Sequence, residues 1–164
     1  MAILCQHKIQ KVMLAGRWVL IPLTVTLLLH ACSQRKNIYT SECSEGIIYK
    51  RVNFSHLVDS IKYYDKQYVE VTGKYVEGKN LSALLNDSNV IDRGNSHALW
   101  VNFSQDCPLI LTGTHTGLFE YGDGNFSKIN NHIMTVRGKV DRHQKGHLKS
   151  YRGAIDIVSY VELR

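Results

Sequence analysis

The chain has 164 residues, of which 44% are hydrophobic and 21% charged, and its formal net charge is +6. Three of its 20 cations, Lys8, Lys11 and Arg17, precede residue 32 with no acidic residue among them, so the rest of the chain carries only +3. This length suits one small domain with a real core. The modest charge excludes a protein that binds polyanions with its whole surface.

The first 31 residues have the order of an export signal. The basic stretch is followed by an apolar run from Trp18 to Leu29, which has 12 residues, whereas a helix that crosses a bilayer needs about 20. A short apolar run after a basic stretch is typical of a signal peptide rather than a membrane span. Translation from Met13 instead of Met1 would leave a compact signal with Arg17 as its charge.

The end of this segment, Leu29-His30-Ala31-Cys32, resembles the lipobox of bacterial lipoproteins. The resemblance implies removal of residues 1–31 and attachment of diacylglycerol to the Cys32 sulfur. In that family an Asp after the cysteine retains the protein at the inner membrane, so Ser33 favours the outer membrane of the cell envelope. A plain secretory signal and an uncleaved anchor are the alternatives.

Residues 32–47 are predicted to be a polar tether between the lipid and a folded domain over residues 48–164. The segment is too polar to bury enough apolar surface to order itself. Cys43 and Cys107 are the two cysteines left after the signal and the lipidated residue. The compartment beyond the inner membrane is oxidising, so this pair forms a disulfide or stays as two thiols, and the sequence leaves both open.

Apolar residues at helical spacing predict one helix over residues 54–65. Its start can be capped by Asn53 or Ser55, because either side chain can accept a hydrogen bond from a free amide. The residues that share one face of this helix are Phe54, Leu57, Val58, Ile61 and Tyr64.

Five later segments have the alternation or the apolar content of β-strands. They cover Tyr68–Tyr75, Asn80–Leu85, Ala98–Phe103, Met134–Val140 and Ala154–Leu163. In the last of them, Ile155, Ile157 and Val161 are expected to point to the same side. Between residues 104 and 131 the signal is weak and glycines interrupt it.

The first and fourth of these strands share one pattern, with Gly73-Lys74 in one and Gly138-Lys139 in the other. Glycine inside a strand suggests a bend, and bent strands let a sheet close on itself. The repeated Val-x-Gly-Lys pattern resembles the glycine-bent strands of OB-fold proteins, and the order of elements resembles small exported OB-like lipoproteins of unknown function. The resemblance implies a mainly β, five-stranded OB-like barrel with one N-terminal helix. An SH3-like barrel or an open sheet capped by a helix is the alternative.

Histidines are the most tempting candidates for chemistry. His143 and His147 are four apart, with His132 upstream, but Gly146 places the pair in a turn, where the spacing that lets two histidines share a metal on one helix face does not apply. We expect solvated loop histidines. No nucleophile or paired-carboxylate motif is recognisable, so no catalytic residue, metal or cofactor is predicted.

Residues 128–152 hold seven Lys and Arg residues against the single acid Asp141. In OB-folds a strand face and its adjoining loops bind oligonucleotides or oligosaccharides, and aromatic rings add stacking. The sequence therefore predicts a binding face, and a solvated strand face with the aromatic rings in the core is the alternative. The predicted face consists of Trp100, Arg137, Lys139, Arg142 and Tyr151.

These patterns together predict an envelope protein anchored by lipid at Cys32. Its domain is expected to bind or support a protein or glycan partner in the envelope, and a nucleic acid partner is not expected. A hydrolase that uses a histidine and faces the periplasm or the cell surface is the alternative.

Overall fold

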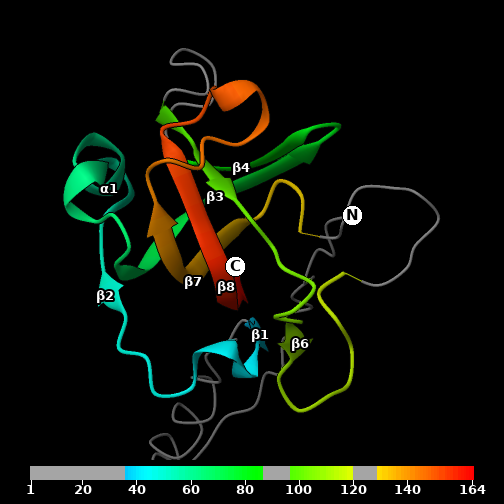
Figure 1. Cartoon of the computed structure of the whole chain (residues 1–164). Helices are drawn as coiled ribbons and strands as arrows, with labels where there is room; N and C mark the ends of the chain where they lie inside the picture. The colour runs from blue at the N-terminus through cyan, green and yellow to red at the C-terminus, as the bar shows by residue number, and fades with distance from the viewer. Residues whose placement is uncertain (1–35, 87–96, 120–128) are drawn as a thin grey trace, which may run out of the picture. The chain divides into compact units, whose positions relative to one another are not determined.

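The computed structural model describes residues 36–86, 97–119 and 129–164, and these consist mainly of β-strands (Figure 1). The predicted signal segment 1–31 and Cys32 lie outside the described residues. Within those ranges, no helix has the length and apolar content needed to cross a membrane. In chain order the elements are β1 (Asn37–Thr40), the short 3-10 helix η1 (Glu42–Ser44), β2 (Lys50–Arg51), α1 (Phe54–Asp59), the 3-10 helix η2 (Ile61–Tyr63), β3 (Tyr68–Gly78), β4 (Leu81–Leu85), β5 (Leu99–Val101), β6 (Ile110–Leu111), β7 (Ile133–Asp141), the 3-10 helix η4 (His147–Lys149) and β8 (Gly153–Leu163).

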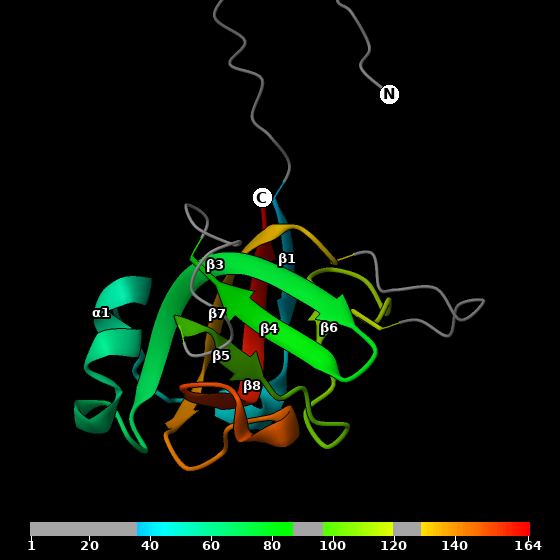
Figure 2. The ribbon, with the colours of Figure 1, turned by 90° about the horizontal axis from the view of Figure 1, so that it is seen from above.

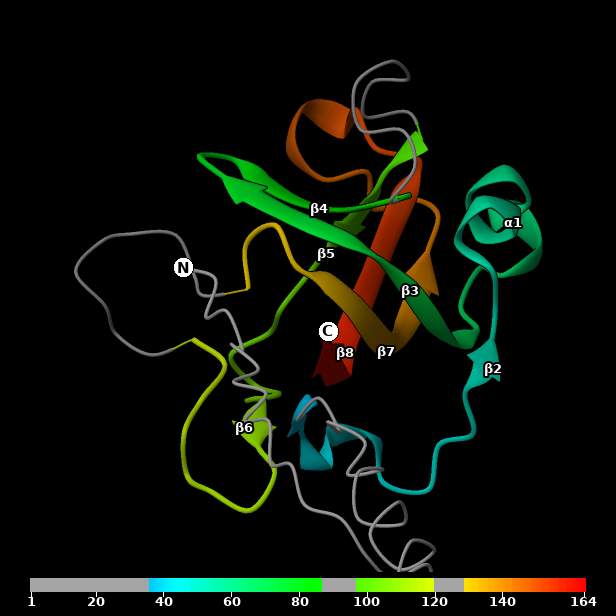
Figure 3. The same ribbon diagram turned by 180° about the vertical axis from the view of Figure 1, so that it is seen from behind.

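Five strands close into a barrel. β3 pairs antiparallel with β4, β4 antiparallel with β5, and β5 parallel with β8. β8 then pairs antiparallel with β7, and β7 pairs antiparallel with β3, so the path returns to its start. This closed order confirms the mainly β, five-stranded OB-like barrel, and Figure 2 shows how far β3 bends to follow the closure. In Figures 1 and 3, α1 and β6 lie at opposite flanks of the barrel.

Glycines permit the close approach of neighbouring strands. A Cβ atom on Gly138 would lie 2.5 Å from Cγ2 of Ile155 and 2.7 Å from the carbonyl oxygen of Asp156, so β8 could not pack against β7 at this point. The pairing register of β7 and β8 shifts here, between Arg137 and Lys139. A Cβ atom on Gly73 would likewise lie 2.6 Å from the carbonyl oxygen of Leu85 on β4, which is too close for any side chain.

The helix before the barrel is shorter than predicted. α1 ends at Asp59, Ser60 leaves the helical conformation, and η2 follows, so the single helix predicted over 54–65 is wrong beyond Asp59. Asn53 is the residue that caps α1, because its side chain accepts from the His56 amide at 3.3 Å. The predicted apolar face is confirmed: its five residues are all buried in the main core.

Strand β8 departs from the alternation of buried and exposed residues that the sequence predicts. Ile155 and Val161 are fully buried, as expected, but Val158 is buried with them and Ile157 is only half-buried. Ile157 has a φ of +49°, which breaks the regular alternation of side chains in β8. The period-2 pattern could not reveal this irregularity, because it assumes an unbroken strand.

Part of the segment predicted as a tether forms regular structure. Residues 37–40 form β1, which pairs antiparallel with both β8 and β6, and η1 follows it directly. Two half-buried residues, Ile38 and Tyr39, are the apolar part of β1. β1 is ordered by hydrogen bonds to strands that lie 70 or more residues away in the chain. The composition of the segment itself therefore could not predict a strand here.

Candidate binding surface

The predicted binding face divides between two sides of the barrel. Arg137 and Lys139 lie on the outside of β7, whereas Trp100 lies on the outside of β5. β8 separates these two strands in the barrel, so their outer faces diverge. Arg142 lies after β7, where its Nε is 3.3 Å from Oδ2 of Asp65.

Trp100 and Tyr151 are packing residues. Their ring centroids are 5.2 Å apart, and they form a small cluster with Ala83 and Ala98 in which Tyr151 is only 3% exposed. Gly146 lies so close to this cluster that a Cβ atom would be 2.5 Å from the Trp100 ring. In OB-folds the ligand face is commonly formed by the strands equivalent to β4 and β5. Here the loop that contains Gly146 packs against Trp100, which is half-buried, and Tyr151 is buried, so the Tyr151 ring is not exposed to a ligand.

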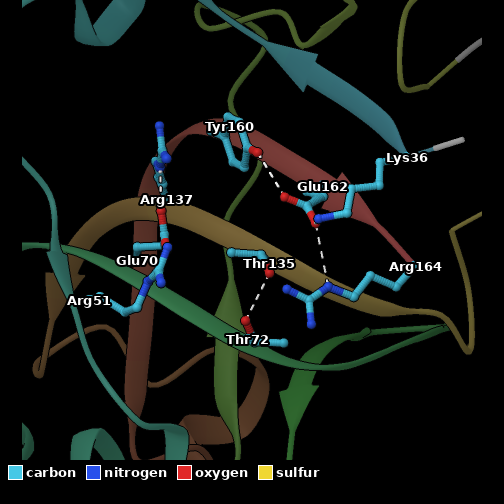
Figure 4. A network of polar contacts seen from close by, with 9 residues as sticks. All are labelled: Lys36, Arg51, Glu70, Thr72, Thr135, Arg137, Tyr160, Glu162 and Arg164. Atoms are coloured by element: carbon cyan, nitrogen blue, oxygen red, sulfur yellow. Dashed lines mark hydrogen bonds and ion pairs between the residues drawn. The ribbon is translucent and has the colours of Figure 1, made fainter. Parts of the chain in front are cut away.

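Arg137 is the centre of a different surface, on β3, β7 and β8 (Figure 4). Its Nε donates to Oε2 of Glu70 at 2.8 Å, while Arg51 Nε donates to Oε1 of the same carboxylate at 2.7 Å. The Arg137 guanidinium carbon lies 4.2 Å from the ring centroid of Tyr160 and 5.8 Å from that of Tyr49. Two aromatic rings and one carboxylate therefore hold the guanidinium in place.

Tyrosines continue this surface toward Lys139. The Tyr49 ring meets the Tyr68 ring edge to face at 5.8 Å, and Nζ of Lys139 lies 5.8 Å from the centroid of Tyr68. The Tyr49 hydroxyl shares a hydrogen bond of 2.9 Å with Ser159. We call this surface the arginine–tyrosine face. It consists of Tyr49, Arg51, Tyr68, Glu70, Arg137, Lys139 and Tyr160.

Glu70 is the single acid of the arginine–tyrosine face. Burial raises the pKa of its carboxyl group, but the hydrogen bonds from Arg137 and Arg51 outweigh burial, and the pKa lies below its ordinary value. The carboxylate is therefore ionised at neutral pH and accepts from both arginines. In this state it orients the guanidinium groups and is not available as a general base.

We expect Glu70→Gln to destabilise the barrel at neutral pH. The folded-state pKa of Glu70 is below the ordinary 4.5, so its stabilising contribution is complete above that pH and is lost as the pH falls through the folded-state value. The loss at pH 7 should be about 1–2 kcal/mol and come mainly from Arg137, because the Arg51 side chain is 86% exposed and screened by water.

Chemical denaturation across this pH range measures the effect. The difference between the wild type and Glu70→Gln should shrink as the pH falls below 4.5. Glu45→Gln, a change at an exposed carboxylate outside the face, is the control and should leave stability nearly unchanged. A loss for Glu70→Gln that does not vary with pH would contradict this assignment.

The sequence pattern missed most of the arginine–tyrosine face. Arg137 and Lys139 are the two of its residues that were predicted, and Tyr49 and Arg51 come from a segment with no strand signal. The similar patterns of β3 and β7 are the one sequence signal for the rest of the face, because the pairing of these two strands places Glu70 opposite Arg137. Tyr160 also lies opposite Arg137, from the other side.

The histidines do not come together in a metal site. Within the described residues, no group of three or more His, Cys, Asp or Glu side chains is arranged to hold a metal ion. His143 Nε2 lies 3.0 Å from Arg142 Nε. His132 lies near the start of β7, and His147 lies in η4 after the far end of that strand.

Cys43 and Cys107 are joined by a disulfide in the structure, with a Cα–Cα distance of 5.6 Å. The bond ties η1, just after β1, to the segment between β5 and β6. The two cysteines are 64 residues apart in the chain. The bond therefore connects the start of the folded domain to its middle.

Comparison with known proteins returned no match: no family model, no curated protein and no solved structure is significantly similar to this chain.

Proposed function

We propose that this protein is a lipid-anchored envelope protein whose barrel binds an acidic glycan through the arginine–tyrosine face. The observation that carries the proposal is the arrangement around Arg137, which two tyrosine rings and Glu70 hold in one orientation. A side chain that is already ordered loses little conformational entropy when a ligand binds.

The charge of the face favours an anionic ligand. Arg51, Arg137 and Lys139 provide three cations against the carboxylate of Glu70, and Asp156 on β8 lies opposite Lys139, so cations outnumber acids by three to two. A guanidinium group has five N–H donors. Because Arg137 and Arg51 share the Glu70 carboxylate, each arginine keeps N–H donors that this carboxylate does not accept. Arginine also pairs well with further carboxylates because of its planar, forked geometry.

The shape and the aromatic content favour a sugar polymer. Cross-strand register places Tyr68 opposite Lys139, and Glu70 opposite Arg137, so the face extends along the strands. Tyrosine offers an apolar ring and a polar hydroxyl, which suit the apolar faces and the hydroxyl groups of sugars. OB-like barrels bind oligosaccharides among other ligands, although commonly on the strands equivalent to β4 and β5.

Calorimetric titration with oligogalacturonate, a carboxylated sugar polymer, tests the proposal. We expect binding that weakens with added salt, and no binding of uncharged dextran. The double variant Arg137→Gln/Lys139→Gln should bind at least about tenfold more weakly, since loss of a single charged contact worth about 1.5 kcal/mol already weakens binding by that factor.

The matched control is Lys62→Gln/Lys145→Gln, which removes two exposed cations outside the face and should bind as the wild type does. Equal binding by the two double variants would contradict the proposal. Capture of an acidic envelope protein through Arg137, with no affinity for the glycan, would make the face a protein-docking surface instead.

A further inference from the structure

The end of the barrel where β1 begins and β8 ends carries a row of cations. Asn37, Leu163, Met134 and Gly73 are cross-strand neighbours on β1, β8, β7 and β3. One residue farther out, Lys74 lies opposite Ile133, and the Arg164 amide donates to the Ile133 carbonyl oxygen at 3.0 Å. The row that we call the cationic end consists of Lys36, Lys74 and Arg164.

Among residues 36–86, 97–119 and 129–164, one acid has a described contact with this row. Glu162 accepts from Lys36 at 2.9 Å and from Arg164 at 3.4 Å through the same oxygen, Oε1 (Figure 4). The side chains of Lys36 and Arg164 remain 57% and 54% exposed. The side chains described at the cationic end therefore carry three positive charges against the one negative charge of Glu162.

Little chain separates this end from Cys32. Because β1 begins at Asn37, five residue steps connect the two positions, and even a fully extended chain covers at most about 18 Å in that number of steps. A domain that began at residue 48 would have had a tether of about 55 Å. The loop after β7, over residues 142–152, lies at the other end of the 11-residue β8, roughly 30 Å away (Figure 2).

We propose that the cationic end docks on anionic phospholipid headgroups, so that the barrel stands on the bilayer with the 142–152 loop pointing away from it. This inference rests on the lipid anchor of the proposed function. An anionic leaflet attracts Lys and Arg side chains that lie within about a Debye length, roughly 10 Å, of its surface. The short connection holds the three cations close to that range, and the arginine–tyrosine face remains open at the side.

Lysine footprinting of the lipidated mature protein tests the orientation. The protein is inserted into vesicles of phosphatidylcholine alone or with phosphatidylglycerol, exposed to an amine-acetylating reagent and analysed by mass spectrometry. We expect Lys36 and Lys74 to react about threefold more slowly on the anionic vesicles than on the neutral ones, and high salt to remove the difference. Lys145 and Lys149, on the far loop, should react equally on both.

Arg164→Gln should reduce the protection of Lys36 and Lys74, whereas Lys62→Gln, a change outside the cationic end, should not. Equal labelling of Lys36 and Lys74 on both kinds of vesicle, in protein that sediments with the vesicles, would overturn the docking and leave the anchor standing. Protection of the same size on neutral vesicles would overturn the role of headgroup charge. Protein that does not sediment with vesicles would overturn the anchor and the docking together.

Discussion

Replacing Cys32 by Ser is expected to move the protein from the detergent phase to the aqueous phase in phase-partition experiments, and to abolish incorporation of labelled fatty acid. A hydroxyl group cannot take the place of the thiol that receives diacylglycerol. A single acyl chain holds a protein only marginally, whereas two or more hold it stably, so the wild-type attachment should survive high salt. Loss of the fatty-acid label should therefore be nearly complete, and the fraction that a general signal peptidase releases after Ala31 should move to the aqueous phase.

The control for this experiment is Cys5→Ser, which changes a cysteine inside the predicted signal segment and should leave partition and labelling unchanged. Cys32→Ser also blocks lipoprotein-type cleavage, although a general signal peptidase can still release a soluble form after Ala31. If the wild type and Cys32→Ser take up equal label and partition alike, the lipobox interpretation is wrong. The location of the protein would then be that of simple secretion.

Loss of the disulfide is expected to have the largest effect on folding stability. The bond closes a loop across 64 residues of sequence, and the chain-entropy model assigns such a loop about 4 kcal/mol. The Cα–Cα distance of 5.6 Å lies within the range that a disulfide spans without backbone movement. Stability should fall by about 2–4 kcal/mol, because residual structure in the unfolded chain reduces the stabilisation below the model value.

The double variant Cys43→Ser/Cys107→Ser measures this effect without leaving a free thiol. Its denaturation midpoint should match that of the wild type in reductant, and reductant should not change the variant further. Mass spectrometry of non-reduced peptides from envelope-isolated protein checks the bond directly. Two separately alkylated cysteines in that material, or equal midpoints for variant and oxidised wild type, would contradict the prediction.

The barrel could be predicted because its signals are local. Gly73 and Gly138 mark the bends, and alternating apolar residues around them mark the two strands. β1 and β6 could not be predicted, because short edge strands take their order from partners that are distant in sequence.

The binding surface could be predicted only in part, for a geometric reason. Alternation within β7 places Arg137 and Lys139 outside, but it does not say which other strands share their side of a closed barrel. Trp100 also points outward, yet it faces away from β7 and packs against the loop that contains Gly146. Grouping outward residues needs the strand order, which one sequence pattern does not provide.

The position of the disulfide directly behind β1 sets how this domain bears mechanical load. In a chain anchored at Cys32, a pull between the membrane and a partner reaches β1 first and can peel it from β8. The extension then stops at Cys43, because that residue is covalently joined to Cys107. From Asn37 to Cys43 the chain has six residue steps, so peeling of β1 extends it by at most about 21 Å before the disulfide carries the force. In an anchored chain, tension beyond that point therefore passes through the disulfide to the segment between β5 and β6, and not through the chain after Cys43 alone.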